Sequence, residues 1–146
     1  MKRELCLLII CLLNASFAIA EEWESIIKDD DHEVLVDIDS YNVTDNLPYL
    51  VAKTIYEKPQ QFNIPKKKIT YTTSIATFQF NCVDPLYRIR SIKLLDKDGK
   101  LVETVKISGG LQKINPNTDE FSIGQLTCSV HQMLGETAPP NQEKSN

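Results

Sequence analysis

The feature of the sequence that most constrains the fold is a pair of cysteines, Cys82 and Cys128, which follow an N-terminal export signal. In an oxidising compartment such a pair is expected to form a disulfide. The bond closes a loop of 46 residues (128 − 82), for which chain entropy predicts roughly 4 kcal/mol of stabilisation. Metal ligation and a reactive thiol are the alternatives, and the wide separation of the two cysteines disfavours a zinc site.

Residues 1–20 have the three parts of a removable signal peptide. A cationic start at Lys2 and Arg3 precedes the apolar run Leu5–Leu13, and the small residues of Ala18-Ile19-Ala20 predict cleavage after Ala20. The apolar run is shorter than the about 20 residues that cross a bilayer, so no membrane span is expected after cleavage. Neither cysteine of the leader follows a small residue, so an acyl anchor is not expected either.

The length of the mature chain predicts one domain. Cleavage leaves 126 residues (146 − 20), and we expect a single hydrophobic core over residues 21–135. The polar segment 136–146 contains a Pro-Pro pair and predicts a disordered tail. Loss of the leader changes the net charge from −4 to −5 (14 − 19), which argues against a nucleic-acid partner.

Most of the mature chain has the pattern of β-strands separated by turn-forming residues. In the longest candidate strand, Phe78, Phe80 and Cys82 alternate with polar residues and therefore share one face. Asp98-Gly99 predicts a tight hairpin turn, because this dipeptide tolerates positive backbone angles. The candidate strands are Trp23–Lys28, Val34–Ile38, Tyr49–Glu57 (ended by Pro59), Ile69–Val83, Tyr87–Leu95 and Leu101–Ile107.

A helix is predicted after the strands. Asn117, with Glu120 three residues later, has the spacing of a helix cap, and we expect the helix to end near Gly135. Gly124 costs this helix about 1 kcal/mol relative to alanine, so tertiary packing must compensate. A bond from Cys128 to Cys82 would attach the helix to one face of the sheet. The apolar residues at helical spacing are Ile123, Leu126, Val130, Met133 and Leu134.

Several features occur together in a particular order along the chain. They are Trp23, Val34-Leu35-Val36-Asp37 followed by Tyr41, Phe80-Asn81-Cys82 closing a long strand, the turn Asp96-Lys97-Asp98-Gly99-Lys100, and Ile114-Asn115-Pro116-Asn117 leading into the helix with Cys128. This order resembles that of the surface-adhesin protein E family of Gram-negative envelope proteins. The similarity covers roughly residues 23 to 134, nearly the whole mature chain.

The resemblance implies an α+β fold, in which an antiparallel sheet of about six strands carries a C-terminal helix on one face, tied by the disulfide. It also implies a binding module of the periplasm or cell surface. Adhesins of the family attach to host matrix or serum proteins, and dimers are known. Because the precursor lacks an acylation cysteine, a soluble periplasmic structural or assembly protein, paired with an envelope component, is the alternative.

No enzymatic template is found, and the protein is expected to be neither an enzyme nor a carrier of a cofactor or metal. The sequence lacks a nucleophile elbow, a phosphate-binding loop, a zinc-protease motif and Cys-x-x-Cys. His32, in a charged turn, and His131, near the end of the helix, are interpreted as structural. A solvated turn is favoured over a calcium site for the acidic cluster Asp29, Asp30, Asp31 and Glu33.

The candidate partner-binding residues are basic or aromatic. A basic patch would suit an acidic partner, although lysine runs also keep strand edges soluble and unpaired. Tyrosine is enriched in interfaces but is also common in ordinary sheets, so the aromatic candidates are open to both interpretations. The candidates are Lys66, Lys67, Lys68, Arg88 and Arg90 for the patch, and Tyr49 and Tyr56 for the aromatic contacts.

Overall fold

The computed structural model describes residues 22–137, which fold into one antiparallel sheet and a C-terminal helix. The predicted signal peptide and most of the predicted tail lie outside the described residues. The elements are β1 (Trp23–Lys28), β2 (His32–Thr44), β3 (Leu47–Ile64), β4 (Lys67–Asn81), β5 (Leu86–Leu95), β6 (Leu101–Lys106), β7 (Gln112–Lys113) and α2 (Asp119–Thr137).

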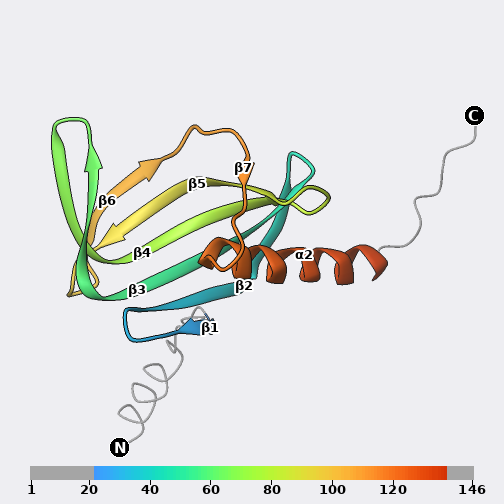
Figure 1. Ribbon diagram of the computed structural model, residues 1–146, viewed down its shortest axis with the longest axis horizontal. Coiled ribbons are helices and arrows are strands. Elements are labelled where there is room, and N and C mark those ends of the chain that lie inside the picture. Colours follow the sequence, from blue (N-terminus) through green and yellow to red (C-terminus); the bar gives the residue numbers. More distant parts are fainter. Residues whose placement is uncertain (1–21, 138–146) are drawn as a thin grey trace, which may run out of the picture.

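The strands follow one another across the sheet in chain order, from β1 to β6, and the short β7 pairs with β5 beyond the end of β6 (Figure 1). Short turns make this order possible. Asp45 and Asn46 form the two-residue β2–β3 turn with φ of 55° and 60°, a conformation that Asp and Asn tolerate better than most residues. Gly99 has φ of 75° in the β5–β6 turn, as the Asp-Gly dipeptide predicts.

The predicted fold class is confirmed, and the main error concerns the length of β3. The sequence predicts that this strand ends before Pro59, but it continues to Ile64. The pairing with β4 jumps from Ile55↔Thr73 to Gln60↔Tyr71, so extra residues of β3, Pro59 among them, form a bulge. Proline is tolerated at a bulge because no ladder hydrogen bond is required of its nitrogen.

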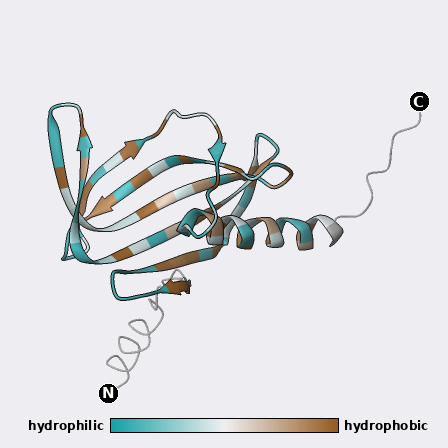
Figure 2. Ribbon diagram, viewed as in Figure 1, coloured by the Kyte–Doolittle hydropathy of each residue, from teal (hydrophilic) through white to brown (hydrophobic). Residues whose placement is uncertain are grey.

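The hydrophobic core lies between the sheet and α2. Phe78 and Phe80 stack with ring centroids 6.2 Å apart, and Tyr87 of β5 extends this aromatic layer at 6.3 Å from Phe80. Figure 2 shows hydrophobic residues along the central strands and hydrophilic residues at the tip of the β3–β4 hairpin. The buried residues of the core are Val34, Val36, Leu50, Ala52, Ala76, Phe78, Phe80 and Ile123.

The helix begins one residue later than its predicted cap allows. Thr118, not Asn117, caps α2, because its hydroxyl oxygen accepts a hydrogen bond from the backbone N–H of Phe121 at 3.4 Å. Asn117 instead takes a positive φ of 65° in the turn before the helix. At the other end the helix continues to Thr137, two residues past Gly135, within the margin by which helix ends vary.

A disulfide and a close packing contact help to hold α2 on the sheet. The predicted disulfide between Cys82 and Cys128 is present, with Cys82 just after the end of β4. Gly124 lies so close to Phe80 that a Cβ atom added to the glycine would be 2.9 Å from the ring. The glycine in the helix is therefore explained by close packing against a phenylalanine that is fully buried.

We predict that removing the disulfide with the double substitution Cys82→Ser and Cys128→Ser lowers the free energy of unfolding by about 2–4 kcal/mol, because the 46-residue loop is then open in the unfolded chain. Urea unfolding followed by circular dichroism measures the change. The double variant should not respond to reductant, whereas the native protein should lose stability in it. Equal stability of the native protein with and without reductant would contradict the prediction.

A second prediction compares two glycines of the same helix. Gly124→Ala should destabilise the protein by about 1 kcal/mol, since overpacking of Phe80 costs roughly 1–3 kcal/mol and improved helix propensity returns about 1 kcal/mol. Gly135→Ala should be neutral or stabilising, because nothing lies within 4 Å of the added methyl group. Thermal unfolding of the two variants gives the comparison, and equal effects would show that Phe80 does not limit the packing of α2.

Candidate functional site

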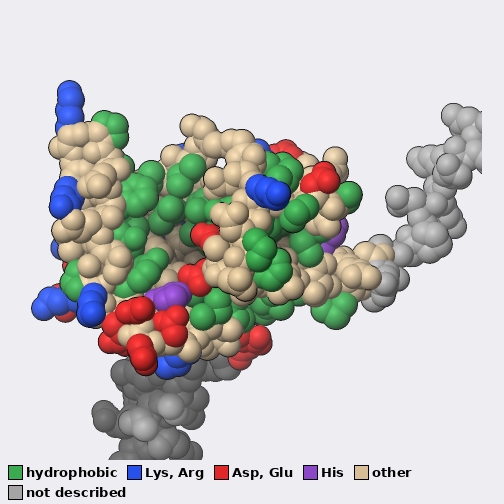
Figure 3. Space-filling model, in the orientation of Figure 1, with side chains coloured by type: hydrophobic (Ala, Val, Ile, Leu, Met, Phe, Trp, Pro, Cys, Tyr) green, Lys and Arg blue, Asp and Glu red, His purple; other side chains and the backbone are tan. Residues whose placement is uncertain are grey.

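A cavity of about 140 Å³ opens on the sheet face that α2 covers, in front of the first turn of the helix. The helix crosses one end of the sheet, and the β3–β4 hairpin rises at the other end (Figure 1). Between them Figure 3 shows a hollow lined by hydrophobic side chains, with acidic side chains and a histidine beside it. We call this space the tyrosine cavity, after Tyr56 of β3 and Tyr71 of β4, which line it.

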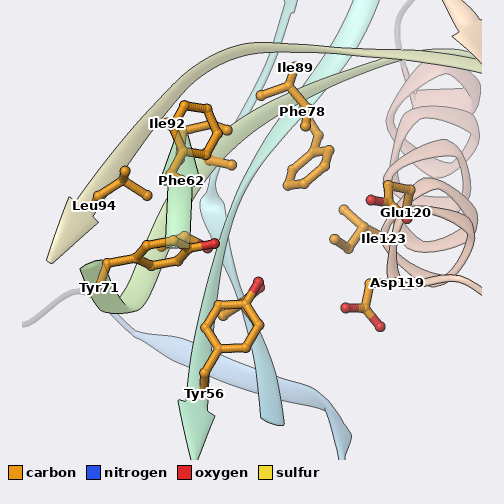
Figure 4. Close-up of a pocket in the computed structure, with 13 residues that line it drawn as sticks. Tyr56, Phe62, Tyr71, Phe78, Ile89, Ile92, Leu94, Asp119, Glu120 and Ile123 are labelled. Carbon is orange, nitrogen blue, oxygen red and sulfur yellow. The ribbon is translucent and has the colours of Figure 1, made fainter. Parts of the chain in front are cut away.

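The walls of the tyrosine cavity come from three strands and the helix. Phe62 and Tyr71 belong to the β3–β4 hairpin, beyond the bulge that bends it, and Ile123 comes from the helix (Figure 4). The floor is the hydrophobic face of the sheet, formed by Phe78, Ile89, Ile92 and Leu94.

The two tyrosines present both ring surface and hydroxyl groups. Their rings meet edge to face, with centroids 5.8 Å apart and planes at 85°. Burial raises the pKa of Tyr71 to about 12, with a further contribution from the charge and hydrogen bond of Tyr56. The Tyr71 hydroxyl therefore stays neutral at physiological pH and can both donate and accept a hydrogen bond.

Two carboxylates stand at the mouth of the cavity. Asp119 and Glu120 are in the first turn of α2, where the positive end of the helix dipole favours negative charge. Asp119 is paired with His32, whose Nε2 lies 3.0 Å from its carboxylate oxygen. Glu120 is half-buried and makes no ion pair within the described part of the chain.

His32 connects the β1–β2 turn to the start of the helix. Its Nδ1 lies 3.1 Å from Asp29, and its ring stacks on Tyr56 with centroids 6.1 Å apart. Partial burial by itself lowers the pKa of His32, but the hydrogen bond and charge of Asp119 and the charge of Asp29 outweigh it, so the pKa is raised. The carboxylate of Asp29 accepts hydrogen bonds from the backbone N–H groups of His32 and Asp31, which lower its own pKa.

A comparison with known protein families matches residues 23–129 to the family described as surface-adhesin protein E. The chain belongs to this family. No curated protein and no solved structure matches the chain in the corresponding comparisons. Membership places the protein among the exported, adhesin-like proteins of the cell envelope. Within residues 22–137, no helix has an apolar stretch long enough to cross a bilayer.

In this member of the adhesin family, the predicted basic residues form two separate groups. Lys66 lies in the β3–β4 turn, and Lys67 is the first residue of β4. The Lys67 ammonium group pairs with Glu103 at 2.8 Å. Arg88 and Arg90 lie on β5, where Arg88 is in register with Gln79 of β4. Lys68 and Gln79 are 11 residues (79 − 68) apart on the same strand, about 35 Å at the usual rise. Lys66, Lys67, Lys68, Arg88 and Arg90 therefore do not form one patch.

The two arginines brace the β2–β3 turn on the opposite face of the sheet. Gln79 is only 1 % exposed, and its side-chain oxygen accepts hydrogen bonds from Arg88 at 2.9 Å and Arg90 at 3.2 Å. Both arginines also pair with Asp45 in the turn, at 3.5 Å. Tyr49, paired with Gln79 across β3 and β4, borders a separate hollow there of about 180 Å³. Of the aromatic candidates, only Tyr56 thus belongs to the tyrosine cavity.

The second histidine, His131, makes a contact between the helix and the sheet. His131 of α2 lies with its Nδ1 2.7 Å from the hydroxyl oxygen of Tyr41 on β2, so it links the later turns of the helix to the sheet. Burial raises the pKa of Tyr41. Among residues 22–137, no group of three or more His, Cys, Asp and Glu side chains is arranged to hold a metal ion.

Sequence reasoning misses most of the tyrosine cavity. Phe62 and Tyr71 are not among the predicted site residues, because their convergence depends on the bulge in β3, which has no clear signature beyond Pro59. The acidic first turn of α2 is visible in the sequence, but its position against Tyr56 is not. The one available signal is that Phe62 and Tyr71 lie on the two sides of the turn at Lys66. A longer hairpin would bring these two residues together.

The contacts of His32 predict that the stability of the protein depends on pH. Because its folded pKa is raised above the usual 6.5, its stabilising effect is fully present below about pH 6.5 and is lost as the pH rises through the folded value. Chemical unfolding from about pH 5.5 to about pH 8.5 measures this decline. His32→Gln should flatten it, whereas His131→Gln should leave it in place. An unchanged slope in His32→Gln would contradict the assignment.

Proposed function

We propose that the protein is a non-enzymatic binding protein of the bacterial envelope that captures a protein partner through the tyrosine cavity. The observation that carries this proposal is an open cavity lined by aromatic and aliphatic side chains, with the neutral hydroxyl of Tyr71 inside it and carboxylates at its mouth. Membership of an adhesin family gives the cavity a biological context. If the protein is displayed on the cell surface, the partner is a host matrix or serum protein. If it stays in the periplasm, the partner is an envelope component.

The chemistry of the cavity favours binding. Tyrosine offers a large hydrophobic surface with a polar end and is enriched at the energetic centres of interfaces. His32 does not face the cavity as a free base, because both of its nitrogens are directed at carboxylates, those of Asp29 and Asp119. The lining therefore supplies contacts and hydrogen bonds, which is what capture of a partner requires.

The disulfide supports a location outside the cytoplasm. Such bonds form and persist in oxidising compartments, including the periplasm and the cell surface. We propose that residues 1–20 direct the protein there and are then removed. Whether the partner is of host or envelope origin decides between an adhesin and a periplasmic assembly protein, and capture from each source separately distinguishes the two.

Filling the cavity should abolish capture. Ser74 lines the cavity, whereas its neighbour Thr73 lies on the other face of β4, opposite Ile55. We predict that Ser74→Leu retains the thermal stability of the native protein but loses its partner, because the larger side chain occupies the space. The measurement is capture by the immobilised protein from serum and matrix proteins in one arm and from envelope extract in the other.

Thr73→Leu is the matched control, since it adds the same side chain to the adjacent position but leaves the cavity open. A partner that is retained by Thr73→Leu and lost by Ser74→Leu identifies the cavity as the binding site. Equal capture by both variants would show that the partner binds elsewhere, and the proposed role of the cavity would then be wrong.

A further inference from the structure

We propose that the tyrosine cavity receives a lysine side chain of the partner protein. This inference rests on the proposed function and names the chemistry that the cavity recognises. It depends on three observations: aromatic rings around the space, a carboxylate at its mouth that has no ion pair within residues 22–137, and the hydroxyl groups of Tyr56 and Tyr71, which point into the space (Figure 4).

Aromatic side chains surround the space in which the side chain would lie. Tyr56, Phe62, Tyr71 and Phe78 reach the cavity from β3 and β4 (Figure 4). The faces of aromatic rings attract ammonium groups through their quadrupole, and the attraction increases when the cation is withdrawn from water. The same rings cover the hydrophobic stem of a lysine, which is normally packed along apolar surface while its charged end reaches a polar partner.

The carboxylate of Glu120 distinguishes a cationic guest from a purely hydrophobic one. A leucine or phenylalanine that closed the cavity would withdraw this carboxylate from water and give it no compensating partner, which is unfavourable. An ammonium group supplies that partner. Asp119 is already occupied by His32, so within the described residues Glu120 is the carboxylate of this pair that a guest can engage.

Lysine suits the arrangement better than arginine. Its compact ammonium group has three donors that can be shared between the carboxylate of Glu120 and the hydroxyl oxygens of Tyr56 and Tyr71. A planar guanidinium is matched by a carboxylate presented edge-on for two parallel hydrogen bonds. The acidic surroundings, which include Asp29, add attraction for any basic segment that carries the lysine (Figure 3).

The test uses two small probes that differ only in the ammonium group. Nα-acetyl-lysine methylamide and Nα-acetyl-norleucine methylamide are titrated into the isotope-labelled protein, and amide chemical shifts of Tyr56, Tyr71 and Glu120 report binding at the cavity. We expect the lysine probe to bind at least about fivefold more tightly, with affinity that falls as salt is added. Equal or tighter binding of norleucine, or no shift with lysine, would overturn the inference.

Substitution of the carboxylate provides the second measurement. Glu120→Gln keeps the shape of the side chain and removes its charge, so we predict about fivefold weaker binding of the lysine probe and no change for norleucine. Glu24→Gln, at an exposed position on β1, is the matched control and should bind both probes as the native protein does. Equal affinity of Glu120→Gln and Glu24→Gln for lysine would show that Glu120 does not hold the ammonium group.

The two proposals fail in distinguishable ways. If the probes show no preference for lysine while Ser74→Leu still abolishes capture of the partner, the cavity binds a different side chain and the proposed function stands. If Ser74→Leu leaves capture intact, the proposed function fails, whatever the probes show.

Discussion

The attachment of α2 to the sheet at Phe80 and Cys82 determines the rest of the structure. The disulfide fixes Cys128, and Gly124 allows the helix backbone to approach the buried ring of Phe80 closely. The first residue of the helix then lies nine residues (128 − 119) before the bond, about 14 Å along the axis. This distance sets where the helix begins, and therefore how much of the hydrophobic sheet face remains open. The tyrosine cavity lies over this open part of the face, beside the first turn of the helix.

The same placement brings charge to the edge of a hydrophobic space. Asp119 and Glu120 are adjacent in the sequence, yet their environments differ, since Asp119 is compensated by His32 and Glu120 lacks a comparable partner in the described structure. The helix dipole makes both carboxylates acceptable at this position. His32 in turn holds the β1–β2 turn against the helix through Asp29. The mouth of the cavity therefore combines one interaction that stabilises the fold with one group that is available to a ligand.

The sequence predicts the fold better than it predicts the site. The bounds of β1, the Asp98-Gly99 turn and the cysteine pair follow from local chemistry, and all are confirmed. Errors arise where tertiary structure overrides a local rule. Pro59 does not end β3, because in the bulge its nitrogen is not required to donate a hydrogen bond to the neighbouring strand. The cap shifts from Asn117 to Thr118 because Asn117 is needed in the preceding turn. The site requires residues whose proximity is set by strand register, which a single sequence does not encode locally.

The β3–β4 hairpin has a consequence for how proteins of this kind could diversify. Beyond the bulge it extends past the shared hydrophobic core, and within the described residues its tip is joined to the sheet by the ion pair of Lys67 with Glu103. Residues such as Phe62 can therefore be exchanged, or the hairpin lengthened, with little effect on the disulfide-linked half of the molecule. One wall of the proposed binding cavity is thus free to evolve separately from stability, so that related proteins can share a scaffold while differing in the shape of this cavity.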